Sequence, residues 1–182
     1  MKSLFTPSDS DNIVASLNRS QAVIEFKPDG TIITANDNFL KAVGYSLEEI
    51  EGRHHAMFVA DGEADSEEYA QFWKALASGK YQSAEYKRFG KNGTEISIQA
   101  TYNPVLDAAG KTYKVIKFAT DISARKLQAA DYQCQLEAIS KSQAVIQFEL
   151  DGTIISANKN FLDALGYSLD EIKGQHHRIF VD

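Results

Sequence analysis

Apolar and polar residues alternate along the chain in short runs that predict β-strands. Residues 22–27 and 31–35 are two such runs, separated by a Pro-Asp-Gly turn. Proline fixes φ, aspartate caps the turn with its side chain and glycine accepts the left-handed position, so the two runs predict a hairpin. Residues 80–89, 94–106 and 112–120 are further strand candidates, and an Asn-Gly dipeptide typical of hairpins joins the first two.

Between the second and third strand candidates the apolar spacing is that of short helices. Asn36 or Asp37 can cap a helix that Gly44 ends, and Ser46-Leu-Glu-Glu49 has the form of a capping box that opens another.

Two further helices are predicted in this module. Residues 69–78 place Phe72, Trp73 and Leu76 on one helical face, and a short helix with an apolar stripe precedes the first strand. The element order predicts an α+β domain with one five-stranded antiparallel sheet and its short helices gathered on one face.

A long polar helix is predicted after the last strand, with Asp121 as its cap. Within it Ala129, Tyr132, Leu136 and Ile139 recur at spacings of 3, 4 and 3. This is coiled-coil spacing over less than two heptads, and a single amphipathic helix docked on its own domain explains it equally well.

The chain contains a long internal repeat. Residues 20–60 align with residues 142–182 at a constant offset of 122, and by direct count 28 of the 41 aligned positions are identical. A repeat with this few copies indicates a duplicated domain and not a solenoid. It predicts a tail and short helix over residues 1–19, a complete domain over 20–123, a helical linker over 124–141 and the first half of a second domain over 142–182.

The second copy has only two of the five predicted strands. A two-stranded sheet with a bare edge is only marginally stable. We therefore expect residues 142–182 to be disordered or to borrow the surface of a partner chain.

Composition narrows the classes of function. Hydrophobic residues make up 43% of the chain and charged residues 24%, which is ordinary for a globular protein, and the net charge of −6 argues against a nucleic-acid partner. No apolar run approaches the length of a membrane span, and the N-terminus lacks the apolar core of a secretion signal. Cys134 is the only cysteine, so a reducing, cytoplasmic location is expected.

The complete module resembles a PAS sensory domain. The matching stretches are DGTIITAN, NFLKAVGYSLEEIEG, FWKALASGKYQSAEYKRFGKNG and VIKFATDIS. The last is similar to the Asp-Ile-Thr junction of PAS domains, with Ser123 in place of threonine, and the resemblance implies an ion pair between Asp121 and Arg125 that transmits the signal. With its two HHxxFV segments, the chain is most similar to the tandem-PAS cytoplasmic part of bacterial methyl-accepting chemotaxis proteins of the aerotaxis and biofilm-dispersion type.

All four histidines occur as adjacent pairs, His54-His55 and His176-His177. Adjacent side chains on a helical turn diverge by about 100°, so a pair cannot chelate one metal ion, and no metal site is expected. One inward imidazole of His54 and His55 can serve as the axial ligand of a haem, as in haem PAS domains. The alternative is a purely structural role, with the inward histidine capping backbone groups and the outward one solvated.

Trp73 is the only tryptophan, and the resemblance implies that it can wall a flavin pocket with FAD as the cofactor. The second tryptophan of aerotaxis flavin domains is replaced by Tyr81, and Cys134 lies outside the domain, which excludes a photochemical flavin–cysteinyl adduct. The simpler interpretation is that Trp73 anchors the core beside Phe72. The cofactor therefore stays open.

Enzymatic motifs such as GxxxxGK[ST], HExxH and GxSxG are missing, so no catalytic activity is expected. The sequence thus predicts a sensor of a small molecule, gas or redox state that passes its state to the linker helix. Homodimers and a downstream signalling domain in the same chain are expected partners. The alternatives are a cofactor-free dimerisation module, or the sensor of a histidine kinase or cyclase.

Overall fold

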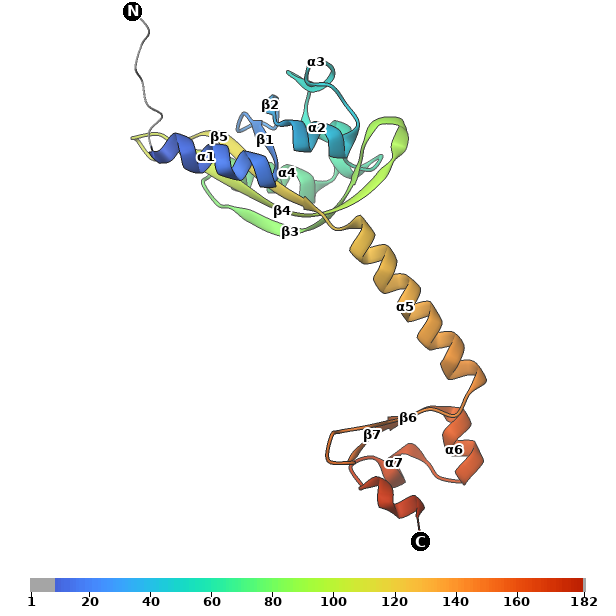
Figure 1. Ribbon diagram of the computed structural model, residues 1–182. Coiled ribbons are helices and arrows are strands. Elements are labelled where there is room, and N and C mark those ends of the chain that lie inside the picture. The colour runs from blue at the N-terminus through green and yellow to red at the C-terminus, as the bar shows by residue number, and fades with distance from the viewer. Residues whose placement is uncertain (1–8, 182) are drawn as a thin grey trace, which may run out of the picture. The chain divides into compact units, whose positions relative to one another are not determined.

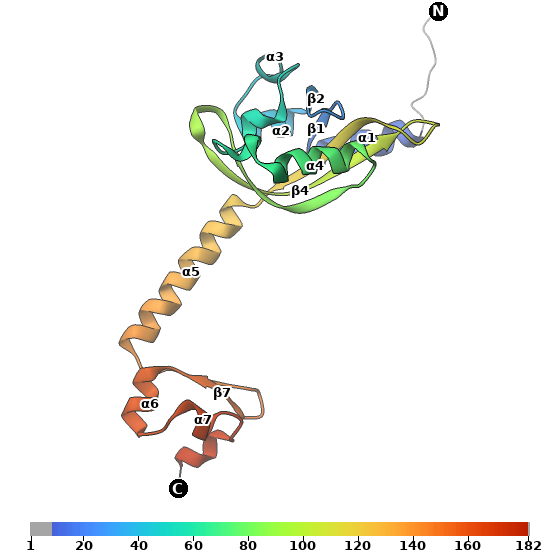
Figure 2. The ribbon, with the colours of Figure 1, turned by 180° about the vertical axis from the view of Figure 1, so that it is seen from behind.

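The computed structural model describes residues 9–181, so the predicted tail over residues 1–8 lies outside the described part. The chain divides into two compact units, Met1–Lys126 and Leu127–Asp182, which are described separately. Figures 1 and 2 show the ribbon from opposite sides.

The first unit contains one antiparallel sheet of five strands in the order β2-β1-β5-β4-β3. The strands are β1 (Ala22–Phe26), β2 (Ile32–Ala35), β3 (Gln82–Phe89), β4 (Glu95–Leu106) and β5 (Thr112–Asp121). The β1–β2 and β3–β4 hairpins are those that the turn residues predict, and β4 and β5 form a third. β1 and β5 lie far apart in sequence but pair side by side, with Ile24 opposite Lys117. This pairing joins the β1–β2 hairpin to the other three strands in one sheet.

The helices between β2 and β3 cover one face of the sheet (Figure 1). They are α2 (Asp37–Val43), α3 (Leu47–Ile50), the 3-10 turns η1 (His55–Phe58) and η2 (Glu63–Asp65), and α4 (Glu67–Ala77); a further 3-10 turn, η3 (Lys91–Gly93), joins β3 to β4. The predicted five-stranded α+β architecture is thereby confirmed. α1 (Asp9–Ser20) precedes β1, and its Leu17 lies beside Phe118 and Thr101 on the opposite face.

Local sequence determines where most of these helices start. The Asn36 side chain accepts a hydrogen bond from the backbone N–H of Phe39, and Ser46 and Glu49 form the predicted capping box. α4 begins two residues earlier than predicted, because Ser66 caps it by accepting from the N–H of Tyr69. Part of the acidic stretch before α4 is ordered as η2.

The second unit repeats the front half of the first. It consists of most of α5 (Ser123–Ser142), followed by β6 (Ile146–Phe148), β7 (Ile154–Ala157), α6 (Lys159–Leu165), α7 (Leu169–Ile172) and η4 (His177–Phe180). Ile146 pairs with Ala157 as Ile24 pairs with Ala35, so the register of the hairpin is the same in both copies. The structure therefore gives these residues ordered elements, and the expectation of disorder is not confirmed.

None of the helices described in residues 9–181 is long and apolar enough to cross a membrane.

Candidate ligand-binding interior

The interior between sheet and helices contains a fully buried histidine, His55, at the start of η1. Its Nδ1 lies 2.8 Å from the Tyr69 hydroxyl, and its Nε2 lies 3.0 Å from the Tyr102 hydroxyl. Burial lowers the pKa of His55 well below the ordinary value of 6.5, and the nearby positive charges of Lys117 and Arg88 lower it further. The ring is therefore neutral: one nitrogen donates to a tyrosine and the other accepts from the second tyrosine.

His54 has a different, structural role at the surface. The N–H of Ala56 donates to its Nδ1 at 3.1 Å, so Nε2 carries the proton and donates to the carbonyl of Asp29 at 2.7 Å. Gly30 lies directly beneath, with a φ of +90°, and a Cβ at this position would approach Nε2 of His54 to 2.5 Å. This explains the glycine that follows Asp29 in the turn.

Trp73 belongs to the aromatic cluster around His55. Its ring lies 5.4 Å from His55 and 5.5 Å from Phe26, centroid to centroid, and both contacts are edge-on. Phe72 packs edge-on against Tyr102 at 4.9 Å. The structure thus brings the predicted site residues His54, His55 and Trp73 together, with Trp73 as part of a filled core.

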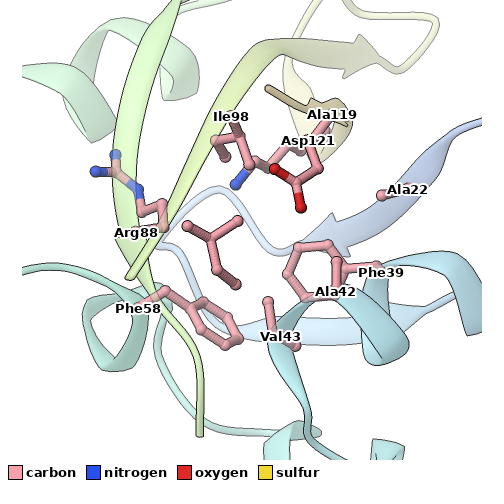
Figure 3. Close-up of a pocket in the computed structure, with 11 residues that line it drawn as sticks. Ala22, Phe39, Ala42, Val43, Phe58, Arg88, Ile98, Ala119 and Asp121 are labelled. Atoms are coloured by element: carbon pink, nitrogen blue, oxygen red, sulfur yellow. The ribbon is translucent and has the colours of Figure 1, made fainter. Parts of the chain in front are cut away.

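A small cavity lies beside this cluster on the inner face of the sheet (Figure 3). Its volume is about 20 Å³. Phe39 and Val43 of α2 and Phe58 of η1 form one side, and Ile98, Ala119 and Asp121 of the sheet lie across from them. The other residues that line it are Ala22, Ala42, Arg88, Ile96 and Lys117.

This interior does not fit either of the expected cofactors. Pockets for ligands of drug or cofactor size have volumes of about 300–1,000 Å³. All four ring nitrogens of His54 and His55 are already hydrogen-bonded, so the arrangement gives no support to haem ligation. Trp73 is buried and its ring packs against those of Phe26, His55 and Phe72. Among the described residues, no group of three or more His, Cys, Asp or Glu side chains is placed to hold a metal ion.

The junction between sheet and linker helix differs from the expected one. Asp121 accepts a hydrogen bond from the N–H of Ser123 at 2.8 Å, whereas Arg125 lies 3.5 Å from Glu85 of β3 and Lys126 lies 2.8 Å from the same carboxylate. The predicted ion pair between Asp121 and Arg125 is therefore wrong. Asp121 precedes the first helical residue, so the i to i+4 spacing of a helix does not apply to this pair.

The second copy reproduces the front of this site. His177 lies edge-on to Phe148 at 5.4 Å, as His55 does to Phe26, and the N–H of Arg178 donates to Nδ1 of His176 at 3.1 Å. His177 is exposed, because the described residues of this copy include no counterpart of Tyr69 or Tyr102.

Sequence patterns missed four residues of the interior: Tyr69, Arg88, Tyr102 and Lys117. Lys117 shares a face with Val115 and Ala119, but Ile116 and Phe118 are more apolar and point the other way. Period-2 alternation in β5 therefore favours the wrong face. Only the pairing of β5 with its two neighbours decides which face is inward.

Comparison with known protein families matches both copies. A family model described as PAS fold matches residues 32–119, and a model described as PAS domain matches residues 142–182. The biofilm dispersion protein BdlA of Pseudomonas aeruginosa is 43% identical over 169 residues, which cover 93% of this chain and 40% of that protein. A blue-light-activated histidine kinase of Brucella ovis is 24% identical over 78% of this chain and 29% of its own length. The chain thus spans well under half of either relative.

Solved structures share the fold at low sequence identity. A PAS domain from Colwellia psychrerythraea aligns with a TM-score of 0.57 at 17% identity, covering 64% of this chain and 99% of that one. An RNA-binding light-oxygen-voltage receptor aligns with a TM-score of 0.57 at 21% identity, over 79% of this chain and 41% of that one. At these identities the likeness shows the fold alone.

Proposed function

The chain belongs to the PAS domain family, and on that premise we propose that residues 20–123 form the sensory module of a signal transducer. The module responds to a small molecule, gas or redox state and passes its state to α5, without catalysis of its own. The observation that carries this proposal is the buried Tyr69–His55–Tyr102 network, which links α4 and η1 to β4 of the sheet that continues into the linker helix.

The route from network to helix is short. Tyr102 on β4 is paired with Lys117 on β5, and Ile98 on β4 is paired with Asp121, the last residue of β5. Asp121 in turn holds the first turn of α5 through Ser123. A change in the interior that displaces β4 against β5 therefore acts on the start of the helix. The ligand must favour one arrangement of this junction over another, as a population shift requires.

Asp121 and Arg125, the residues predicted at the junction, both transmit the signal in this proposal. Each does so through a partner other than the one predicted. Asp121 acts through the N-terminus of α5. Arg125 acts through Glu85, together with Lys126, and ties the helix to β3. The helix start is thus attached to two strands of the sheet, β5 and β3, which lie on either side of β4.

We further place the module in a cytoplasmic, homodimeric transducer of the methyl-accepting chemotaxis type, with a downstream signalling domain in the same chain. The similarity to a protein named for biofilm dispersion supports this class. The similarity to a protein named a histidine kinase supports the alternative, the sensor of a kinase or cyclase. A purely structural dimerisation module is the remaining alternative.

Coupling can be tested without knowing the ligand. Tyr102→Phe removes one hydrogen bond of the buried network, and we expect it to change amide hydrogen exchange at the start of α5. In a chain that already carries Asp121→Ala, adding Tyr102→Phe is expected to leave amide hydrogen exchange in α5 unchanged. Tyr81→Phe, at an exposed position, is the matched control. Unchanged exchange in Tyr102→Phe, or loss of folding in Asp121→Ala, would contradict the proposal.

The absorption spectrum of the purified protein separates the cofactor hypotheses. We expect neither haem nor flavin bands, because the interior is filled. The FAD alternative draws its support from the likeness to a light-oxygen-voltage domain studied with a flavin analogue, which aligns with a TM-score of 0.54 at 20% identity over 71% of this chain and 97% of that one. Flavin bands in the purified protein would establish that alternative and require the interior to open.

A further inference from the structure

The cavity on the inner face of the sheet is lined by a buried lysine that forms no ion pair in the described part of the chain. Lys117 points inward from β5, and only 1% of its surface is exposed. Its ammonium lies 4.9 Å from the ring centroid of Tyr102 and 5.7 Å from that of Phe39. None of the ion pairs formed within residues 9–181 includes it. Asp121 lines the same cavity but does not form an ion pair with Lys117. An anion bound beside Lys117 would favour its charged form, which makes this position a candidate for binding one.

Arg88 adds to the positive charge around the cavity. It is also buried, and its guanidinium donates to Glu63 at 3.2 Å and to the carbonyl of Lys87 at 2.7 Å. Its Nε is buried with no hydrogen-bond partner in the described part of the chain. Arg88 is paired with Glu63, whereas Lys117 is paired with no carboxylate, so Lys117 is the basic group at the cavity that is open to an ion pair.

The other walls of the cavity define the size and character of the ligand. Phe39, Val43, Phe58 and Ile98 present apolar side chains to it (Figure 3). Its volume of about 20 Å³ holds one or two water-sized groups. A single negative charge attached to a methyl-sized group matches these dimensions, whereas a metal cation is repelled by Lys117 and Arg88.

From this geometry we propose that Lys117 binds the carboxylate of a short aliphatic acid, and that such an acid is the ligand of the sensory module. The proposal rests on the proposed function and names its ligand class. The carboxylate pairs with the ammonium, and the aliphatic end packs against α2 and η1.

Asp121 connects such a ligand to the junction. Its carboxylate faces the same cavity and also holds the N–H of Ser123 at the start of α5 (Figure 3). A bound carboxylate places a second negative charge beside Asp121. The resulting repulsion weakens the attachment of β5 to α5 in the ligand-bound state.

The test uses acetate as the probe and acetamide as its uncharged analogue, at constant ionic strength maintained with sodium sulfate. We expect acetate to cause saturable amide shifts in two-dimensional ¹H–¹⁵N NMR spectra of the whole chain, centred on Ile98, Lys117 and Ala119. Acetamide is expected to cause none. Lys117→Met should weaken acetate binding by about tenfold or more, whereas Lys114→Met, on the outer face of the same strand, should leave it unchanged.

A third variant tests the position of Asp121. Asp121→Asn keeps an acceptor for Ser123 but removes the negative charge, so acetate should bind more tightly to it. The proposal is overturned if acetate causes no shifts, if acetamide binds as well as acetate, or if Lys117→Met binds acetate as the unaltered chain does. Acetate shifts confined to the cavity, with none in α5, would support the ligand class and contradict the proposed coupling. If acetate does not bind but Tyr102→Phe still changes amide exchange at the start of α5, the ligand class is contradicted and the proposed coupling is supported.

Discussion

The interior contains a residue, Lys117, that makes the folded state less stable than an apolar residue at its position would. Lys117 occupies an inward position between Val115 and Ala119 that an apolar side chain would fill at lower free energy. Burial lowers its pKa well below 10.5, and the charge of Arg88 lowers it further. The chain therefore carries an ionisable group in its core without the partner that usually compensates for it.

Replacing this lysine should stabilise the first unit. We expect Lys117→Met to raise the free energy of unfolding by about 1–3 kcal/mol, because replacing a buried ionisable group by an apolar side chain of similar size is often stabilising by this order. Urea unfolding followed by Trp73 fluorescence measures it, because the only tryptophan lies in this unit. Tyr113→Phe, at an exposed position of the same strand, serves as the control. A destabilised Lys117→Met variant would mean that the ammonium has a compensating partner.

His55 should make stability depend on pH in a defined direction. Its pKa is lowered in the folded state, so as the pH falls below about 6.5 the unfolded chain binds a proton that the folded chain does not. The contribution of His55 to the free energy of unfolding is fully present above about pH 6.5. It decreases as the pH falls below that value, by up to about 1.4 kcal/mol per pH unit.

The matched variant for this prediction is His55→Gln. Its amide can donate to one tyrosine and accept from the other, but it does not titrate. The difference in slope between the two proteins over this range isolates His55 from the other titrating groups. Equal slopes would show that His55 takes up its proton over this range in the folded chain just as it does in the unfolded chain, so that its pKa is not lowered by folding.

At the scale of elements, Asn36 joins three segments and its repeat Asn158 does the same. Oδ1 of Asn36 accepts from the N–H groups of Val23 and Phe39, and Nδ2 donates to the carbonyls of Asn18 and Gln21. The end of α1, the start of β1 and the start of α2 are thus held by one side chain.

Asn158 binds the end of α5 in the same way, through the carbonyls of Ser140 and Gln143. α5 is therefore the exit helix of the first module and the entry helix of the second. A displacement that starts at Asp121 can reach the second module without a further connecting element.

The Asn36 joint predicts a graded loss of stability. Asn36→Ala removes all four hydrogen bonds and should cost about 2 kcal/mol, the upper end for a helix cap. Asn36→Asp keeps the Oδ1 acceptor and loses both donors, so an intermediate loss is expected. Urea unfolding of the three proteins gives the order. A cost of Asn36→Asp equal to that of Asn36→Ala would show that the donors, and not the cap, stabilise the joint.

How much the sequence predicts depends on how local the interaction is. Asn36, Ser46 and Gly44 act on backbone groups a few residues away, so their caps and the hairpins between them follow from local chemistry. The burial of Lys117 and the partner of Arg125 depend on which strands become neighbours. Local sequence patterns carry no information about which strands become neighbours, and for this reason the predicted pair of Asp121 with Arg125 was wrong.

At the scale of the whole molecule, the two copies differ in what covers their apolar side chains. Phe26 is fully buried, whereas 41% of Phe148 at the same position of the repeat is exposed; for Val59 and Val181 the values are 8% and 68%. The sequence of the second copy therefore specifies a core that the rest of the described chain does not complete.

This difference predicts self-association through the second copy. Within the described residues β6 pairs only with β7, whereas β1 pairs with both β2 and β5, so one edge of β6 and the apolar face behind it are available to a second chain. We expect Phe148→Ser combined with Val181→Ser to weaken the dimer by about tenfold or more in sedimentation velocity. Tyr81→Ser, at an exposed position of the first unit, should leave association unchanged. If the unaltered chain remains a monomer at every concentration, or if Tyr81→Ser weakens the dimer as much, then the exposed core of the second copy is not the surface that pairs.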